Sequence, residues 1–183
     1  MEKELFKDYI KEYDATSIIL ERYKTILPGE LLELWREKGF GTFMSGYLKT
    51  INPDDYTKLV RDTYFRGDQA VPIFATAFGD LIVWEESKYV RMVMYKEGRF
   101  KGMESGFKFF FDDLMNDMFK KDFFELELYN AAREKLGKLA YNQCYGFVPL
   151  LGLGGKKSVD NLDIVSIREH IEIIAQMVGK VGV

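Results

Sequence analysis

"VPIFATAFGDLIVWEESKYVRMVMYKEGRFKGME", residues 71–104, alternates short apolar runs with pairs of residues that favour tight turns. The runs 71–77 and 81–86 flank Gly79-Asp80, and the runs 89–95 and 99–104 flank Glu97-Gly98. Runs of this length joined by two-residue turns that contain glycine are typical of β-hairpins. The sequence therefore predicts four consecutive strands of an antiparallel meander.

The segments before this meander favour helices and one more strand. Apolar residues at helical spacing predict a helix over residues 5–13 and another from Ser17. A third helix is expected between Pro28, a favourable first residue, and Gly39, a favourable stop. Residues 42–51 predict a first strand, which makes a sheet of about five strands. Asn52 and Pro53 then have the order expected of an N-cap and a first helical turn.

The segments after the meander return to helical periodicity. Apolar stripes predict helices over 107–118, 124–136 and 164–178. The expected fold class is therefore α+β, with N-terminal helices, a central antiparallel sheet and C-terminal helices. The polar segment 115–122 suggests a boundary that divides an N-terminal lobe, residues 1–118, from a C-terminal helical lobe, residues 119–183, the two packed as one compact unit.

Composition excludes several classes of protein. The 183 residues are 47% hydrophobic and carry a net charge of −3, so the chain is globular and lacks the basic surplus of most nucleic-acid-binding proteins. The single cysteine, Cys144, excludes an intramolecular disulfide and a cysteine-rich zinc site. The charged N-terminus and the absence of an apolar run of about 20 residues predict a cytoplasmic protein that does not span a membrane. The oligomeric state is not indicated.

The glycine-rich segment "YGFVPLLGLGGKKS", residues 145–158, invites comparison with phosphate-binding loops. In a P-loop register the first glycine position falls on Leu150, and the residue after Lys156 is Lys157 instead of serine or threonine. A buried structural turn is therefore favoured for Gly152 to Gly155. An anion held by the Gly152–Lys157 loop, in a small-ligand or nucleotide-responsive regulator, remains the alternative.

No catalytic constellation or metal site is apparent. The only histidine, His170, has no nucleophile or metal partner at a recognisable spacing, so it is interpreted as a surface or packing residue. Cys144 is interpreted as a small buried apolar residue. The adjacent acidic pairs at 54–55 and 112–113 suit helix starts or solvated faces, whereas Glu85-Glu86 follows Trp84 at a strand end and is a candidate for contact with a partner. The chain is expected to bind no cofactor and not to be an enzyme; a hydrolase or transferase of unrecognised type is a weaker possibility.

An ordered set of residues resembles a known family. The segments 27–56 and 74–86 are similar to the GAD-like domain of bacterial proteins. The segment 136–181 is similar to the domain that usually follows it in immunity proteins against type VI secretion DNase toxins. The resemblance covers about residues 16–181 and is loosely shared with Smi1/Knr4-like immunity domains. Its signature residues are Pro28, Trp35, Gly39, Pro53, Gly79, Tyr145, Gly146, Phe147, Pro149, Gly154 and Gly155.

The resemblance implies an immunity protein that binds and neutralises a cognate toxin, a type VI secretion nuclease, without catalysis of its own. One departure is Asn142-Gln143, where the family often has an acidic pair before Tyr-Gly-Phe. A basic nuclease cleft would favour carboxylates, and the interface is therefore expected at Asp80, Trp84, Glu85 and Glu86.

Overall fold

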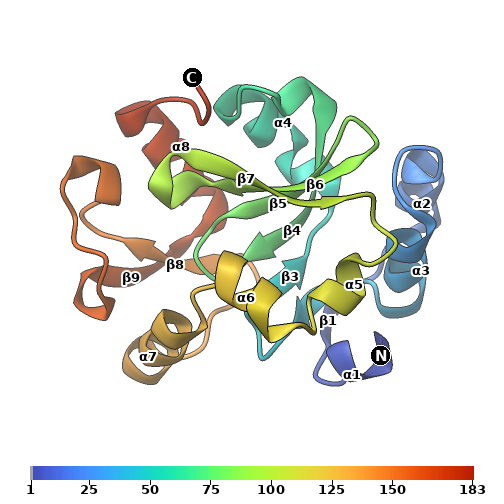
Figure 1. The fold of residues 1–183 in the computed structure, drawn as a ribbon, viewed down its shortest axis with the longest axis horizontal. Helices are drawn as coiled ribbons and strands as arrows, with labels where there is room; N and C mark the ends of the chain where they lie inside the picture. Colours follow the sequence, from blue (N-terminus) through green and yellow to red (C-terminus); the bar gives the residue numbers. More distant parts are fainter. Residues whose placement is uncertain (1) are drawn as a thin grey trace.

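The computed structural model describes residues 2–183. From Glu2 to Ser105 the chain forms helices and the strands of one large sheet (Figure 1). The helices of this part are α1 (Glu2–Leu5), α2 (Ser17–Tyr23), α3 (Gly29–Lys38) and α4 (Pro53–Thr63). The strands are β1 (Ile10–Tyr13), β2 (Phe40–Phe43), β3 (Leu48–Thr50), β4 (Ala70–Thr76), β5 (Leu81–Glu85), β6 (Tyr89–Met94) and β7 (Arg99–Ser105). The short 3-10 turns η1 (Gly67–Gln69) and η2 (Tyr95–Glu97) lie between strands or at their ends.

Within the described residues, the seven strands form one antiparallel sheet in the order in which they occur along the chain. Both predicted hairpins of the meander are present. At the first, the Thr76 backbone N–H donates to the carbonyl of Asp80 at 2.9 Å. At the second, Gly98 adopts the left-handed conformation with φ of 64° after η2. The α+β class is confirmed.

The sheet is larger than the five strands expected, for two reasons. The helix predicted over 5–13 was wrong beyond Leu5, where α1 ends, and residues 10–13 form the edge strand β1 with Ile10 and Tyr13 exposed. Residues 42–51 do not form one strand: β2 and β3 make a hairpin around Met44, Ser45 and Gly46, all with positive φ. The spacing of three between Ile10 and Tyr13, which are both exposed, had suggested the apolar face of a helix.

The C-terminal part contains helices and a second, smaller sheet. Its helices are α5 (Phe110–Asp113), α6 (Asp117–Phe123), α7 (Leu126–Leu136) and α8 (Ile167–Val178), with 3-10 turns η3 (Leu151–Leu153) and η4 (Val159–Asn161). Strands β8 (Gln143–Phe147) and β9 (Leu162–Ser166) pair antiparallel. The sequence predicted a helical C-terminal lobe, whereas the structure contains this second sheet as well. The helix expected from residue 164 begins at Ile167, because Ile164 belongs to β9.

Apolar side chains cover both faces of the large sheet. On β5, Ile82 and Trp84 join the cluster that includes Trp35 of α3 and Phe110 of α5. The alternate residues of β5, Leu81 and Val83, join a second cluster with α4 and α8, which lie on the same face of the sheet (Figure 1). Burial on both sides explains why this stretch of sequence is apolar almost without interruption.

Candidate functional site

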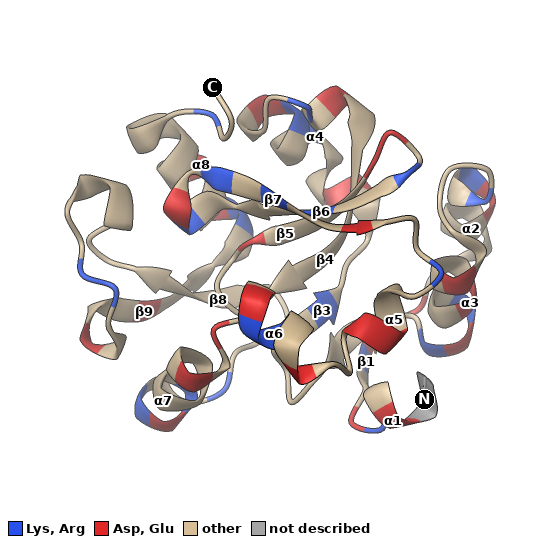
Figure 2. Ribbon diagram, viewed as in Figure 1, with Lys and Arg blue, Asp and Glu red and all other residues tan. Residues whose placement is uncertain are grey.

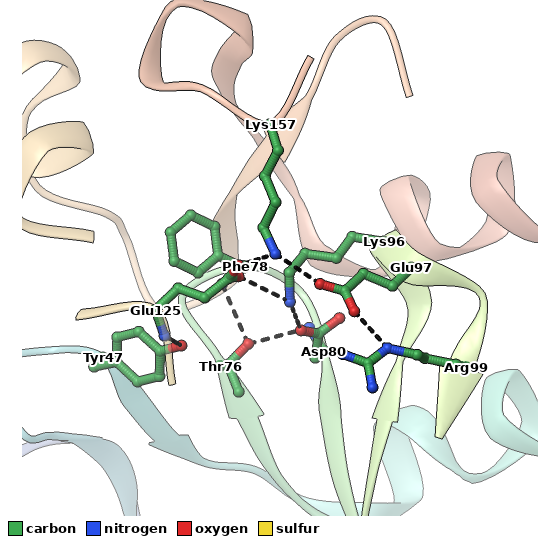
Figure 3. Close-up of polar contacts among 9 residues, drawn as sticks. All are labelled: Tyr47, Thr76, Phe78, Asp80, Lys96, Glu97, Arg99, Glu125 and Lys157. Atoms are coloured by element: carbon green, nitrogen blue, oxygen red, sulfur yellow. Dashed lines mark hydrogen bonds and ion pairs between the residues drawn. The ribbon is translucent and has the colours of Figure 1, made fainter. Parts of the chain in front are cut away.

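A buried ion pair lies where the large sheet meets the C-terminal part of the chain. Asp80 leads into β5 and Lys96 lies in η2, and both side chains are almost fully buried. The Lys96 ammonium forms an ion pair with Asp80 Oδ2 and lies 3.2 Å from Oε2 of Glu125, the residue before α7 (Figure 3). One lysine is thus shared by two carboxylates from distant parts of the sequence.

The chain of alternating charges continues from Glu125 to the surface. Lys157 contacts Glu125 Oε1, and its Nζ also lies 2.8 Å from Glu97 Oε1 (Figure 3). Arg99 Nε donates to Glu97 Oε2 at 2.6 Å. Figure 3 shows Lys157 reaching down from the C-terminal part toward Glu97 and Glu125, so the network, which runs from buried Asp80 to exposed Arg99, links the two parts of the molecule.

These contacts shift the protonation equilibria of the network. Burial alone would lower the pKa of Lys96, but the carboxylates of Asp80 and Glu125 outweigh it and raise this pKa above its usual value. Burial also opposes ionisation of Glu97, yet hydrogen bonds from Lys157 and Arg99 lower its pKa to about 2. Lys96 and Glu97 are therefore charged at neutral pH. Burial raises the pKa of Asp80, and the Lys96 ammonium opposes that shift.

Backbone and ring contacts hold the network in place. Thr76 Oγ1 accepts from the backbone N–H groups of Phe78 and Asp80, each at 3.2 Å, which fixes the turn that carries Asp80. Tyr47 Oη accepts from the Glu125 N–H at 3.2 Å. Asp80 Oδ1 is buried and has no hydrogen-bond partner among the described residues. This oxygen destabilises the folded protein, because a buried acceptor without a hydrogen-bond partner has lost its contacts with water.

A cavity of about 310 Å³ lies beside this network. It is bounded by η2, by η3 and by the face of α8 that carries His170, Ile174 and Val178, and Phe147 and Leu151 contribute further apolar walls. His170 is only 5% exposed and burial lowers the pKa of its imidazole. The histidine interpreted from sequence as a surface or packing residue is therefore buried at a cavity.

The structure does not bring the four expected partner-binding residues to one surface. Asp80 and Glu85 are fully buried, and Trp84 is nearly so, with its indole N–H donating to the Ile26 carbonyl at 3.0 Å. Glu85 Oε2 accepts from the Tyr64 hydroxyl at 2.7 Å, and Glu85 Oε1 lies within ion-pair distance of two arginines, Arg66 and Arg91. Only Glu86, whose side chain is 40% exposed, remains accessible to a partner.

The signature residues of the C-terminal part form internal packing contacts. The Tyr145 N–H donates to the Ala77 carbonyl at 2.8 Å, which joins β8 to the end of β4. Gly146 leaves no room for a side chain, because an added Cβ would lie 2.6 Å from His170 Nε2. Gly79, with φ of 77°, faces Cys144 in the same region, and both Tyr145 and Phe147 are buried.

The signature residues of the loop and of the N-terminal part have similar roles. Gly154 is left-handed with φ of 88°, and the Gly155 N–H donates to the Leu150 carbonyl at 2.9 Å. The Pro149 carbonyl accepts from Asn161 Nδ2 at 2.9 Å. In the N-terminal part, Trp35 is fully buried and the remaining signature residues lie at helix ends: Pro28 and Gly39 flank α3, and Pro53 begins α4.

The polar groups of the loop Gly152–Lys157 mainly contact other residues of the protein. The N–H groups of Leu153, Gly154 and Gly155 all donate to carbonyls of residues 150 and 151. The Lys157 ammonium is held by two carboxylates. An anion would have to displace these partners, so the geometry does not favour the phosphate-binding alternative.

Lys49 of β3 is a buried lysine that sequence inspection did not single out. Its ammonium donates to the carbonyls of Gln143 at 2.8 Å and Ala140 at 3.2 Å. Burial lowers its pKa to about 8. Both acceptors are backbone carbonyls, so these hydrogen bonds bring no countercharge to the ammonium.

Within residues 2–183, no group of histidine, cysteine or acidic side chains is placed to hold a metal ion. In the same range no helix has the length and apolarity required to cross a bilayer. Lysine and arginine positions are interspersed with aspartate and glutamate positions over many elements, as Figure 2 shows.

Two family models match successive segments of the chain. Residues 3–96 match the model of the GAD-like domain, and residues 104–178 match the model described as T6SS immunity protein Tdi1, C-terminal. No curated protein matches the chain. Among solved structures, the crystal structure of Atu4351 from Agrobacterium tumefaciens is similar, with a TM-score of 0.77 and 21% identity over 97% of this chain and 89% of that chain. At this identity the likeness concerns the fold alone.

The two matched segments meet at the charged network, with Lys96 in the first and Glu125 and Lys157 in the second. The chain therefore belongs to the GAD-like domain family and carries, after that domain, the C-terminal domain of type VI secretion immunity proteins of the Tdi1 type.

Proposed function

We propose that this protein acts in the bacterial cytoplasm as an immunity protein that binds a cognate type VI secretion toxin, a nuclease, and blocks its activity without catalysis of its own. The observation that carries the proposal is the ordered match to a GAD-like domain and to the C-terminal domain of an immunity protein. The buried titratable groups are consistent with it, because Asp80, Glu85 and Lys96 are engaged in internal ion pairs and do not converge on an open cleft.

A protein of this kind inhibits by covering a surface of its target, with apolar anchors at the centre of the interface and charges that steer association. A nuclease must bind a polyanion, so its active cleft carries positive charge. The net charge of −3 favours the approach of such a partner, although it does not select a particular face.

The experiment that tests this function is co-purification with the product of the neighbouring open reading frame, followed by a DNase assay with and without this protein. A stable complex together with loss of DNase activity supports the proposal. Absence of a complex with a neighbour that is an active nuclease contradicts it. Growth of cells that express the neighbour alone or together with this protein provides an independent readout of protection.

The same assay tests the one partner-binding candidate that is accessible. Glu86 lies at the tip of the β5–β6 hairpin and forms an exposed ion pair with Arg66 at 3.1 Å. Charge reversal, Glu86→Lys, should weaken binding to a basic partner if this hairpin is at the interface. Asp62→Lys is a matched control, because Asp62 is also an exposed carboxylate in one surface ion pair, with Lys58 at 2.6 Å. Equal affinities of the two variants would place the interface elsewhere.

A further inference from the structure

The cavity next to the charged network has the properties of a binding site for a small ligand. Its volume of about 310 Å³ lies at the lower end of the range of ligand pockets, roughly 300–1,000 Å³. For comparison, an apolar cavity of about 150 Å³ is large enough to bind benzene. The volume therefore suits a ligand built on one aromatic ring with a small substituent.

The walls are mainly apolar and include two aromatic side chains. Phe147 and Tyr95 enclose the cavity from β8 and η2, while Leu150, Ile174 and Val178 contribute aliphatic surface. Aromatic rings pack favourably against other aromatic rings in offset or edge-on arrangements. These walls favour a planar, apolar ring over a polar or flexible ligand.

His170 provides a polar group in the wall of the cavity. The imidazole is 5% exposed and lines the cavity. Gly146 lies against the ring, since a Cβ added at Gly146 would be 2.6 Å from Nε2. A hydroxyl group of a ligand in the cavity can form a hydrogen bond with this imidazole.

The charges around the cavity select a neutral ligand. Lys96 contributes to the wall, but its charge is matched by Asp80 and Glu125. Glu97 also contributes to the wall, and Lys157 and Arg99 match its charge. Burial lowers the pKa of His170, so the imidazole is neutral at pH 7 and can accept or donate a hydrogen bond. A charged ligand of either sign would find no unpaired charge of opposite sign in the cavity wall, so a neutral ligand is favoured.

We infer that this cavity binds a neutral phenol: an aromatic ring that lies against Phe147 and Tyr95 and a hydroxyl group that forms a hydrogen bond with His170. The phenol can come from a free small molecule or from a tyrosine side chain of a bound protein. The site is separate from the Glu86 hairpin, and the inference does not depend on the proposed function.

The test uses p-cresol, which is the side chain of tyrosine as a free molecule. His170 is the only histidine of the chain, so its imidazole C–H signals in a proton NMR spectrum are unambiguous reporters. We expect p-cresol to shift these signals in a saturable manner. Toluene, which lacks the hydroxyl, should bind about two- to tenfold more weakly, and the anion 4-hydroxybenzoate should not bind. Absence of a shift with p-cresol, or equal binding of the anion, would overturn the inference.

Two exposed residues of α8 provide a matched pair of variants. Val178 is 44% exposed and lies at the mouth of the cavity, whereas Ile173 is 50% exposed and is not part of its wall. Val178→Trp should abolish the p-cresol shift, and Ile173→Trp should preserve it. Loss of binding in both variants, or in neither, contradicts a site at this mouth. The series of ligands on the unmodified protein remains decisive if a variant does not fold.

The source of the phenol is identified by competition. If excess p-cresol displaces the bound toxin, a tyrosine of the toxin occupies the cavity; if the complex is unaffected, the ligand is a free phenol. Either result supports the class of ligand. Because the NMR titration needs no toxin, failure of this inference and failure of the immunity function can be distinguished.

Discussion

Lys96 Nζ lies 3.2 Å from Glu125 Oε2, and this contact joins the last residue that matches the GAD-like domain to the segment that matches the immunity-protein domain. The same lysine also forms an ion pair with Asp80. Because these side chains are largely shielded from water, each depends on the others for the stabilisation of its charge. The two matched segments are thus coupled through charge as well as through apolar packing.

The first prediction concerns the removal of Lys96. The substitution Lys96→Met leaves the fully buried Asp80 carboxylate without a counter-ion, and breaking a buried pair in this manner costs about 3–5 kcal/mol. The free energy of unfolding, measured by urea denaturation at pH 7, should fall by this amount. The double variant Asp80→Leu/Lys96→Met removes both charges and should be more stable than Lys96→Met alone. Equal stability of the two variants would show that the isolated carboxylate is not the cause.

The second prediction concerns acid stability and Glu97. Its pKa is lowered to about 2 in the folded protein, from an ordinary value of 4.5. A depressed carboxyl pKa adds stability that is fully present above the ordinary value and is lost as the pH falls toward the folded value. The difference in unfolding free energy between the wild type and Glu97→Gln should therefore be largest above pH 5 and should shrink toward pH 2. Glu37→Gln, at an exposed position of α3, provides a control, and a pH-independent difference at Glu97 would contradict the assignment.

The third prediction concerns alkaline stability and Lys49. Burial lowers its pKa to about 8, from an ordinary value of 10.5. Between these two values the unfolded chain holds a proton that the folded protein has released, so stability should increase as the pH rises from 8 to 10. In Lys49→Met this increase should be reduced, because no ammonium is left to deprotonate at that position. Urea denaturation at pH 7 to 10 measures the effect, and parallel curves for the two proteins would contradict it.

The local parts of the fold were predictable from sequence. Turn chemistry located the hairpins at Gly79-Asp80 and Glu97-Gly98, and Asn52 and Pro53 marked the start of α4. Such signals act within a few residues and do not need the rest of the chain. The edge strand β1 was missed for the opposite reason: only its pairing with β2 determines its conformation, since Ile10 and Tyr13 are exposed.

The candidate site was much less predictable. Asp80 pairs with Lys96, 16 residues away, and Glu85 with Arg66, 19 residues away, so adjacency in sequence gave no sign that these carboxylates are buried. Because these carboxylates lie at the ends of apolar strands, they were expected to be exposed and to contact a partner protein. Both faces of the sheet are covered, however, and the strand ends are buried with them. One signal could have indicated a buried ion pair: Arg91 interrupts the apolar run of β6, and it lies directly opposite Val83 of β5.

The last prediction tests the contact between Gly146 of β8 and His170 of α8. An added Cβ at Gly146 would lie 2.6 Å from both His170 Nε2 and Val165 Cγ2, so Gly146→Ala must displace the histidine or the strand. Overpacking of a tight core costs about 1–3 kcal/mol, and the imidazole signals of His170 should shift. Gly29→Ala is the control, because nothing lies within 4 Å of its added Cβ; it should be neutral or stabilising by up to about 1 kcal/mol. Adding His170→Ala to Gly146→Ala makes room for the methyl group and should recover part of the lost stability. If Gly146→Ala behaves like Gly29→Ala, the glycine is not required by the histidine, and the ring is free to leave the cavity wall.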